Sequence, residues 1–254
     1  MIHKLFDITG KKAVVTGGTR GLGFSMAEGL MEAGCEVVII GSSDKVVDVV
    51  KGFKDKGFKC GGIKGDLGNR KDAVSSFEEA VKFLGNDIDI LVSAAGIQRR
   101  HPFEEFPISE FDEVLAVHLN AVFIQTQLAS CIMLKKGYGK IINVASMLSF
   151  FGGQTVAAYA AAKGAIAQMT KAMSNDLFAK GINVNAIAPG YMATEMNSAL
   201  LANKERLAQI SVRIPAGRWG NGNDMKGATL FLSSPASDYL GGVILPVDGG
   251  YLVK

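Results

Sequence analysis

Three side chains have the types and spacing that proton transfer to an oxygen atom requires: Ser146, Tyr159 and Lys163. Tyr159 and Lys163 stand four positions apart in a helix-forming segment, so they share one face of a helix. A free tyrosine, with a pKa of about 10, is a poor base at neutral pH, but a close lysine and a second cation would lower that pKa by about 2. Ser146 ends an apolar run and could hydrogen-bond the reacting oxygen. We interpret the three as an acid/base site, although Tyr-x3-Lys alone is more often a surface pair.

A glycine-rich turn, TGGTRGLG at residues 16–23, follows the first apolar run and precedes a helical pattern. Gly17, Gly21 and Gly23 permit a tight turn and the close approach of a pyrophosphate to the helix N-terminus, where free N–H groups favour an anion. The spacing is Gly-x3-Gly-x-Gly and not the G-x-G-x-x-G fingerprint of dinucleotide sites. A dinucleotide site is our interpretation, and a purely structural strand-to-helix turn remains the alternative.

The residues after the second and third apolar runs are where a protein of this kind would bind the adenosine half of the dinucleotide. The second run ends in Gly-Ser-Ser-Asp at 41–44, with no carboxylate at its tip for ribose hydroxyls and no arginine for a 2′-phosphate. Arg20, in the glycine-rich turn, could bind a 2′-phosphate, or it could be a surface charge exposed to solvent. We therefore expect NAD(H) with only a slight preference over NADP(H). Asp66 would accept a hydrogen bond from the adenine amino group, or would be an acid at a helix N-terminus.

These candidate sites lie within an alternation of short apolar runs and longer amphipathic segments. Such alternation predicts βαβ units with right-handed crossovers and a parallel sheet covered on both faces. We predict an α/β fold: a single doubly wound (Rossmann) domain over residues 1–254, with about seven strands and with ligands at the carboxyl ends of the strands. The expected strands are residues 13–16, 36–40, 59–64, 88–93, 140–145, 183–188 and 243–247, and the clearest expected helices are 23–33, 69–84, 109–135 and 157–180.

Composition and charge argue against several classes of function. With 48% hydrophobic and 20% charged residues, the chain suits a folded enzyme. The net charge of +3, with both signs interspersed, indicates no nucleic-acid partner. Three scattered cysteines suggest reduced thiols and no metal site. Because no apolar signal begins the chain and no run approaches the roughly 18 apolar residues of a membrane span, we expect a cytoplasmic protein without a membrane partner.

Four motifs together carry a family resemblance: TGGTRGLG, INVAS at 142–146, Tyr159-x3-Lys163 and IAPG at 187–190. In order and spacing they resemble the short-chain dehydrogenase/reductase family, and the resemblance covers essentially the whole chain. It implies a nicotinamide-dependent oxidoreductase in which Tyr159 is the acid/base. It further implies that Lys163 lowers the pKa of Tyr159 and binds the cofactor ribose, and that Ser146 orients the substrate oxygen.

The resemblance also implies that Asn120 is the fourth catalytic residue of the family, holding a water that links Lys163 to solvent. By itself, an asparagine in the apolar stretch AVHLNAVF is more often a satisfied core amide, and that alternative stays open. We expect His118, two positions earlier, to point elsewhere on the helix and to have a structural role.

Further cofactor contacts follow from the resemblance. Residues 93–96 read Ser-Ala-Ala-Gly where the family usually has Asn-Asn-Ala-Gly, so the backbone still approaches the cofactor but the bracing amide contacts are lost. Residues 189–194 correspond to the nicotinamide carboxamide site, and residues 191–215 to a mobile substrate lid. The expected cofactor contacts are Gly17, Thr19, Arg20, Gly21, Leu22, Gly23, Ser42, Asp66, Leu67, Ala94, Ala95, Gly96, Tyr159, Lys163, Pro189, Gly190, Met192 and Thr194.

Four longer phrases resemble bacterial sugar-acid dehydrogenases of this family: AGIQRRHPFEEF at 95–106, ASMLSFFGG at 145–153, INVNAIAPGYMATEM at 182–196 and RIPAGRWG at 213–220. They imply a sugar-acid substrate, most closely a 3-deoxy-2,5-diketo acid that is reduced at one carbonyl. Gluconate with 5-ketogluconate, or a 3-oxoacyl thioester, are the alternatives within the family.

The segment after the fourth expected strand offers a physical reason for an acidic substrate. Arg99 and Arg100 lie there, and an arginine can hold a carboxylate through two parallel hydrogen bonds. Pairing of both arginines with Glu104 and Glu105 at a subunit contact is equally open. The expected substrate contacts are Arg99, Ser146, Gln154, Tyr159 and Tyr191.

A protein that senses a dinucleotide without turnover is the alternative from another class. A protein with that function would be expected to have lost catalytic residues, whereas Ser146, Tyr159 and Lys163 are all present. The family resemblance also implies a homotetramer, with which the apolar end of the chain is compatible.

Overall fold

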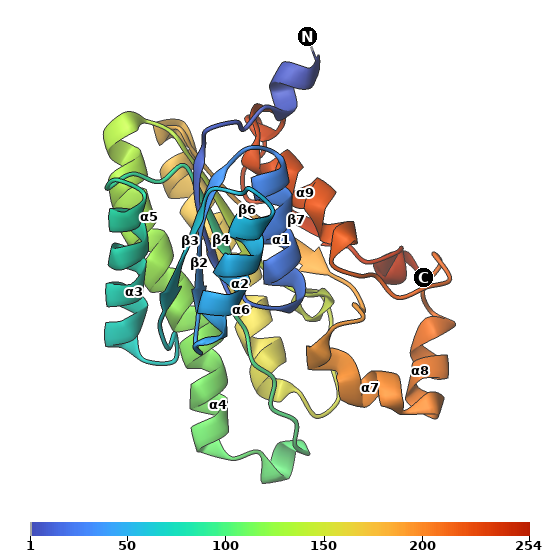
Figure 1. Ribbon diagram of the computed structural model, residues 1–254. Coiled ribbons are helices and arrows are strands. Elements are labelled where there is room, and N and C mark those ends of the chain that lie inside the picture. The colour runs from blue at the N-terminus through green and yellow to red at the C-terminus, as the bar shows by residue number, and fades with distance from the viewer. Residues whose placement is uncertain (1) are drawn as a thin grey trace.

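A parallel sheet between two layers of helices forms the centre of the computed structural model, which describes residues 2–254 (Figure 1). Its seven strands, all parallel, follow the order β3-β2-β1-β4-β5-β6-β7, which confirms the predicted doubly wound fold. The strands are β1 (Lys12–Thr16), β2 (Glu36–Gly41), β3 (Cys60–Lys64), β4 (Ile90–Ser93), β5 (Gly139–Val144), β6 (Ile182–Pro189) and β7 (Ile244–Val247).

The helices cover the two faces of the sheet through separate hydrophobic clusters. Val15 of β1 belongs to the cluster beneath α1 and α9, whereas its neighbour Val14 faces the cluster beneath α3 and α5, because successive side chains of a strand alternate between faces. Figure 1 shows α3 and α5 on one side of the sheet and α1 and α9 on the other. The principal helices are α1 (Gly21–Glu32), α2 (Lys45–Asp55), α3 (Arg70–Phe83), α4 (Ile108–Leu115), α5 (Ala121–Lys136), α6 (Ala157–Leu177) and α9 (Asn223–Ser233).

The strand order reverses between β1 and β4, which lie side by side in the sheet. Such a switch point leaves a crevice at the carboxyl ends of the strands, where α/β proteins bind ligands. The glycine-rich turn follows β1 and the Ser-Ala-Ala-Gly segment follows β4, so both meet there. The two segments are joined by a hydrogen bond of 3.2 Å from the backbone N–H of Ala95 to Oγ1 of Thr16.

The expected helix at 109–135 contains a turn that the sequence pattern did not predict. Residues Ala116–Asn120 form a π-helical turn between α4 and α5. A π-helical turn rotates the side chains that follow it relative to a regular helix, and such turns are frequent at functional sites. The whole segment Ile108–Lys136 is long and apolar enough to cross a membrane by length and composition alone, but Ala129 and Met133 of α5 lie in the core against the sheet.

The segment expected to be the substrate lid leaves the sheet after β6. It holds two short helices, α7 (Ser198–Ala202) and α8 (Lys204–Ser211), which lie apart from the helical layers in Figure 1. Ile210 and Ile214 attach this segment to the body by packing with Met147 and Tyr251 in a small cluster. Leu200 and Tyr191 join the same cluster, so apolar contacts hold the segment along its length.

Candidate active site

The structure brings Ser146, Tyr159 and Lys163 together at the carboxyl end of β5. Ser146 caps a short 3-10 turn, Met147–Ser149, by accepting a hydrogen bond of 3.1 Å from the backbone N–H of Leu148. The turn is fixed to α6, because Oγ of Ser149 donates to the carbonyl of Lys163 at 2.7 Å. Lys163, only 4% exposed, donates from Nζ to the carbonyl of Val144 at 2.5 Å. These contacts hold the serine and the lysine near Tyr159, with which Ser146 shares a hydrogen bond and from whose ring centroid Nζ of Lys163 lies 5.6 Å away.

Burial controls the acid/base properties of Tyr159 and Lys163. It raises the pKa of Tyr159, against the opposing effects of a hydrogen bond with Ser146 and of the positive charge of Arg100. Burial also lowers the pKa of Lys163 to about 7. The sequence had suggested a lowered tyrosine pKa, whereas in the protein alone the phenol is kept protonated. Tyr159 is therefore ready to donate a proton at neutral pH.

His118, a residue of the π-helical turn, packs against Tyr159. The imidazole is 2% exposed and packs edge-to-face on the ring of Tyr159, with centroids 5.1 Å apart. Asn120 is half-buried and makes no hydrogen bond to Tyr159 or Lys163 among the residues described. The expectation that His118 points elsewhere is wrong, whereas the role expected for Asn120 stays a prediction. Sequence reasoning missed His118 because it assumed a regular helix.

The glycine-rich turn has the shape that a dinucleotide pyrophosphate requires. Gly17 has a φ of +68°, and a Cβ at that position would lie 2.7 Å from Cα of Ala95. A Cβ on Gly23 would collide with the carbonyl oxygen of Gly17, so the turn closes only with glycine at both positions. The first residues of α1 have no side-chain cap, since Arg20 makes no such hydrogen bond. Free N–H groups at a helix start beside a narrow backbone turn fit a phosphate group.

The other expected cofactor contacts belong to segments that meet at the same crevice. Two of them, Asp66 and Arg20, already have partners within the protein. Oδ1 of Asp66 accepts from the N–H of Gly68 at 2.9 Å, which closes a local turn. Arg20 pairs with Glu195 of the lid at 3.0 Å, both side chains being about two-thirds exposed. Ser42 is exposed at the end of β2 beside the exposed ion pair of Asp44 with Lys64. Thr19, Gly21, Leu22, Leu67, Ala94, Gly96, Pro189, Gly190, Met192 and Thr194 stand at or next to the carboxyl ends of strands β1, β3, β4 and β6.

The two arginines after β4 lie in different surroundings. Arg99 is held by α4, with Nε 2.9 Å and Nη2 2.8 Å from the carboxylate oxygens of Glu113. Arg100 is exposed, and its charge is close enough to lower the pKa of Tyr159. Partial burial lowers the pKa of Arg100, and the charge of Arg206 on α8 acts in the same direction. Within this chain Arg99 therefore pairs with Glu113 and, at 3.6 Å, with Glu110, while the substrate role expected for Arg99 stays a prediction.

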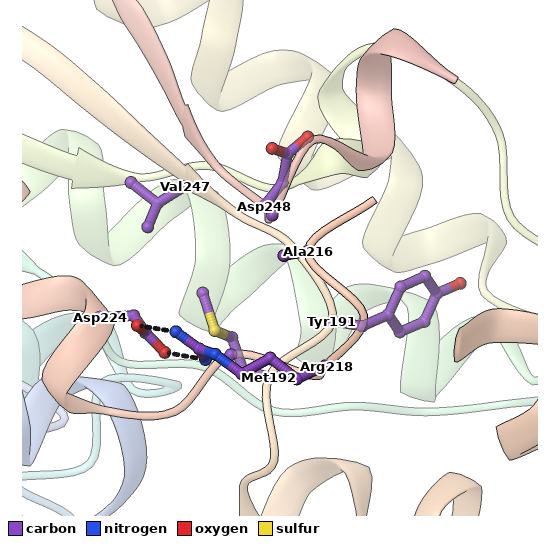
Figure 2. A pocket seen from close by; sticks show the side chains of 9 residues that line it. Tyr191, Met192, Ala216, Arg218, Asp224, Val247 and Asp248 are labelled. Atoms are coloured by element: carbon purple, nitrogen blue, oxygen red, sulfur yellow. Dashed lines mark hydrogen bonds and ion pairs between the residues drawn. The ribbon is translucent and has the colours of Figure 1, made fainter. Parts of the chain in front are cut away.

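The remaining substrate candidates differ in their surroundings. Gln154 is exposed in the loop before α6. Tyr191 packs against Trp219 and Tyr251, with ring centroids 5.2 Å apart in each case. It also lines a cavity of about 180 Å³ between the lid and the end of β7, shown in Figure 2. That cavity is lined by Met192 and the ion pair of Arg218 with Asp224, and not by the catalytic trio, so it is not the reaction pocket.

Comparison with known proteins gives full-length matches. Residues 11–205 match the family model described as short chain dehydrogenase. The chain is 43% identical over 253 residues to the 2-dehydro-3-deoxy-D-gluconate 5-dehydrogenase of Bacillus subtilis, covering 100% of this chain and 99% of that protein. It is 40% identical to the gluconate 5-dehydrogenase of Gluconobacter oxydans, covering 98% of each. The crystal structure of a gluconate 5-dehydrogenase from Burkholderia cenocepacia, in complex with NADP and tartrate, superposes with a TM-score of 0.95 at 38% identity, covering 100% of both chains.

Proposed function

Since this chain belongs to the short-chain dehydrogenase/reductase family and is a nicotinamide-dependent oxidoreductase, we propose that it reduces 2,5-diketo-3-deoxygluconate to 2-keto-3-deoxygluconate. The observation that carries this proposal is the 43% identity along the full chain to a 2-dehydro-3-deoxy-D-gluconate 5-dehydrogenase, in a protein whose Ser146, Tyr159 and Lys163 are assembled. The interconversion of gluconate and 5-ketogluconate is the second candidate, since relatives with that activity are almost as similar.

The catalytic residues account for the proton part of this reaction. A nicotinamide cofactor, held at the glycine-rich turn, supplies the hydride when bound and is positively charged in its oxidised form. Ser146 donates a hydrogen bond to the substrate carbonyl oxygen and so orients it toward Tyr159. Tyr159, whose pKa burial raises, gives its proton to that oxygen as negative charge develops there. Lys163 stabilises the phenolate that remains, because its ammonium group lies 5.6 Å from the centroid of the ring.

The charge around the mouth of this site favours a substrate with a carboxylate. Arg100 lies close enough to Tyr159 to influence its pKa, and the charge of Arg206 on α8 acts on Arg100 in turn. Two like charges so close together are unfavourable unless an anion lies between them. A sugar acid supplies that anion, and a carboxylate between these arginines would place the rest of the sugar chain toward Tyr159.

Substituting Arg100 by alanine is expected to raise KM for the sugar acid by about 10–100-fold, since hydrogen bonds to a charged group contribute about 1.5–3 kcal/mol. kcat should change much less, because the arginine holds the substrate and moves no proton. Steady-state kinetics of Arg100→Ala and Arg99→Ala, measured side by side, test this assignment. A large rise in KM for Arg99→Ala, with Arg100→Ala near the parent value, would return the role to Arg99.

The adenosine end of the site favours the use of NADP(H), which departs from the slight preference for NAD(H) drawn from the sequence. Residues 41–43 at the end of β2 include no carboxylate that would repel a 2′-phosphate, and Asp44 is paired with Lys64 at 2.9 Å. Arg20 is two-thirds exposed beside the turn. Solved relatives that are 41% and 38% identical contain bound NADP.

The experiment that tests the proposed function compares substrates under one set of conditions. Purified protein is mixed with 2,5-diketo-3-deoxygluconate, 5-ketogluconate or a 3-oxoacyl thioester, and the loss of NADPH or NADH absorbance is followed separately. We expect the highest kcat/KM with the deoxy diketo acid and NADPH. A higher value with 5-ketogluconate would establish the second candidate, and turnover of the thioester alone would contradict the sugar-acid proposal.

A further inference from the structure

The segment after β4 is fastened to α4 by four side chains that form one polar network. Glu113 accepts two hydrogen bonds from Arg99, from Nε at 2.9 Å and from Nη2 at 2.8 Å. Oε2 of Glu110 lies 2.8 Å from Nε2 of His101 and 3.6 Å from Nε of Arg99. Ion pairs at the surface contribute little unless they are bidentate or networked, and this group is both. It therefore holds residues 99 and 101 on the same helix.

Arg100 stands between these two anchored residues and is itself left without a carboxylate. Its side chain is exposed, and it makes no ion pair within residues 2–254. The two acids of α4 are already engaged by its neighbours in the sequence. Arg100 is therefore the basic side chain of this segment that remains free to bind an anion.

A third attachment joins the segment to the loop before α6. The backbone N–H of His101 donates to the carbonyl of Thr155 at 3.0 Å. Thr155 has a φ of +63°, which is rare for a β-branched residue and persists only where the surrounding structure enforces it. Thr155 lies four residues before Tyr159, so this hydrogen bond ties the position of residues 99–101 to that of the catalytic tyrosine.

Apolar packing keeps the segment and the two helices together. Ile97 and Phe106, which lie on either side of the arginines in the sequence, pack in one cluster with Val114 of α4 and with Ala158 and Tyr159 of α6. A movement of α4 would therefore move the segment relative to Tyr159.

We propose that Glu110 and Glu113 are positioning residues for substrate binding: they hold Arg99 and His101 against α4, so that Arg100 is presented to the substrate carboxylate. This inference rests on the carboxylate contact proposed above for Arg100. An arginine on an ordered backbone loses less conformational freedom when it binds an anion, so its affinity for the anion is higher. The two acids also neutralise Arg99, whose charge would otherwise compete with Arg100 for the same carboxylate.

Removing one acid at a time tests this role. We expect Glu113→Gln and Glu110→Gln each to raise KM for the sugar acid by about 3–10-fold, the factor expected when one long side chain must be ordered on binding. kcat and the Kd of NADP⁺ should stay within about 2-fold, because the acids affect substrate binding alone. A fall in kcat as large as the rise in KM would overturn the proposal.

Asp112→Asn is the matched control for these variants. Asp112 lies between the two acids on α4, is exposed and has no ion pair in the part of the chain that is described. Its substitution removes the same charge from the same helix and should leave KM within about 2-fold. Equal KM values for Asp112→Asn and Glu113→Gln would show that only the charge of α4 matters, and would overturn the proposal.

A double-mutant cycle shows whether Glu113 acts through Arg100. Arg100→Ala, Glu113→Gln and the double variant are assayed with the sugar acid that the parent protein reduces, and both candidate sugar acids carry the carboxylate. Once Arg100 is alanine, we expect Glu113→Gln to leave KM within about 2-fold, because the effects of coupled residues do not add. The same several-fold rise in that background would overturn the proposal and leave the proposed function intact. An unchanged KM for Arg100→Ala itself would overturn the carboxylate contact, and this inference with it, whichever sugar acid is the substrate.

Discussion

Replacing Tyr159 by phenylalanine is expected to lower kcat by about 10²–10⁴-fold, the usual contribution of one acid/base group. The ring and its packing against His118 are kept, so only the hydroxyl that gives the proton is lost. Cofactor affinity should change little. The measurement is the initial rate of NADPH oxidation with the sugar acid, together with a fluorescence titration of the cofactor.

A matched substitution shows whether the effect is specific to the site. Tyr138 also has a buried hydroxyl, one without a hydrogen-bond partner in the part of the chain that is described, and it lies before β5 at the opposite edge of the sheet. Tyr138→Phe should leave kcat within about 2-fold, as is usual for changes remote from the reacting atoms. If Tyr159→Phe also keeps kcat within that range, Tyr159 is not the proton donor.

Replacing Gly17 by alanine is expected to raise the Kd of the cofactor at least 10-fold and to lower Tm. The positive φ of +68° costs about 1–2 kcal/mol for a residue with a side chain, and the new Cβ would lie 2.7 Å from Cα of Ala95, a backbone atom that cannot move aside freely. Relief of that contact would push the turn away from the segment after β4, and so widen the pyrophosphate site. Calorimetric titration of NADP⁺ and a thermal melt measure the two effects.

Gly57→Ala is the matched control for backbone strain. Gly57 has a φ of +86° in the turn after α2, and a Cβ there would meet no atom within 4 Å. This variant should show a smaller loss of Tm and an unchanged cofactor Kd. If Gly17→Ala binds NADP⁺ as tightly as Gly57→Ala does, the turn after β1 is not the pyrophosphate site.

Much of the fold follows from local sequence patterns. The alternation of apolar runs with amphipathic segments placed the seven strands to within a few residues, because strands buried on both faces are apolar throughout. Ser146, Tyr159 and Lys163 were also predictable, since each side chain is positioned by a strand end or a helix start that the pattern marks. The geometry of these regular elements depends little on contacts with distant parts of the chain.

The errors have a physical cause in contacts between distant segments. The π-helical turn Ala116–Asn120 changes which side chain faces α6, and no local propensity predicts it, so the direction expected for His118 was wrong. Arg99 and Arg100 are adjacent in sequence and chemically identical. Only the fold shows that Glu110 and Glu113 of α4 pair with Arg99.

The raised pKa of Tyr159 has the same kind of origin. The sequence shows a lysine four residues away, which would lower that pKa, but it does not show that both groups are buried. Burial penalises the phenolate and the ammonium ion alike, so it raises the pKa of Tyr159 and lowers the pKa of Lys163 in the protein alone. The positive charge of an oxidised cofactor would act in the opposite direction.

The position at which hydride enters the substrate tests the proposed function most directly. 2,5-Diketo-3-deoxygluconate would be reduced with NADPH or NADH carrying deuterium at the transferable position of nicotinamide C4, and the deuterium located in the product by NMR. We predict a single deuterium at C5, with the C2 carbonyl intact. Deuterium at C2, or no incorporation while 5-ketogluconate is reduced under the same conditions, would contradict the proposed reaction.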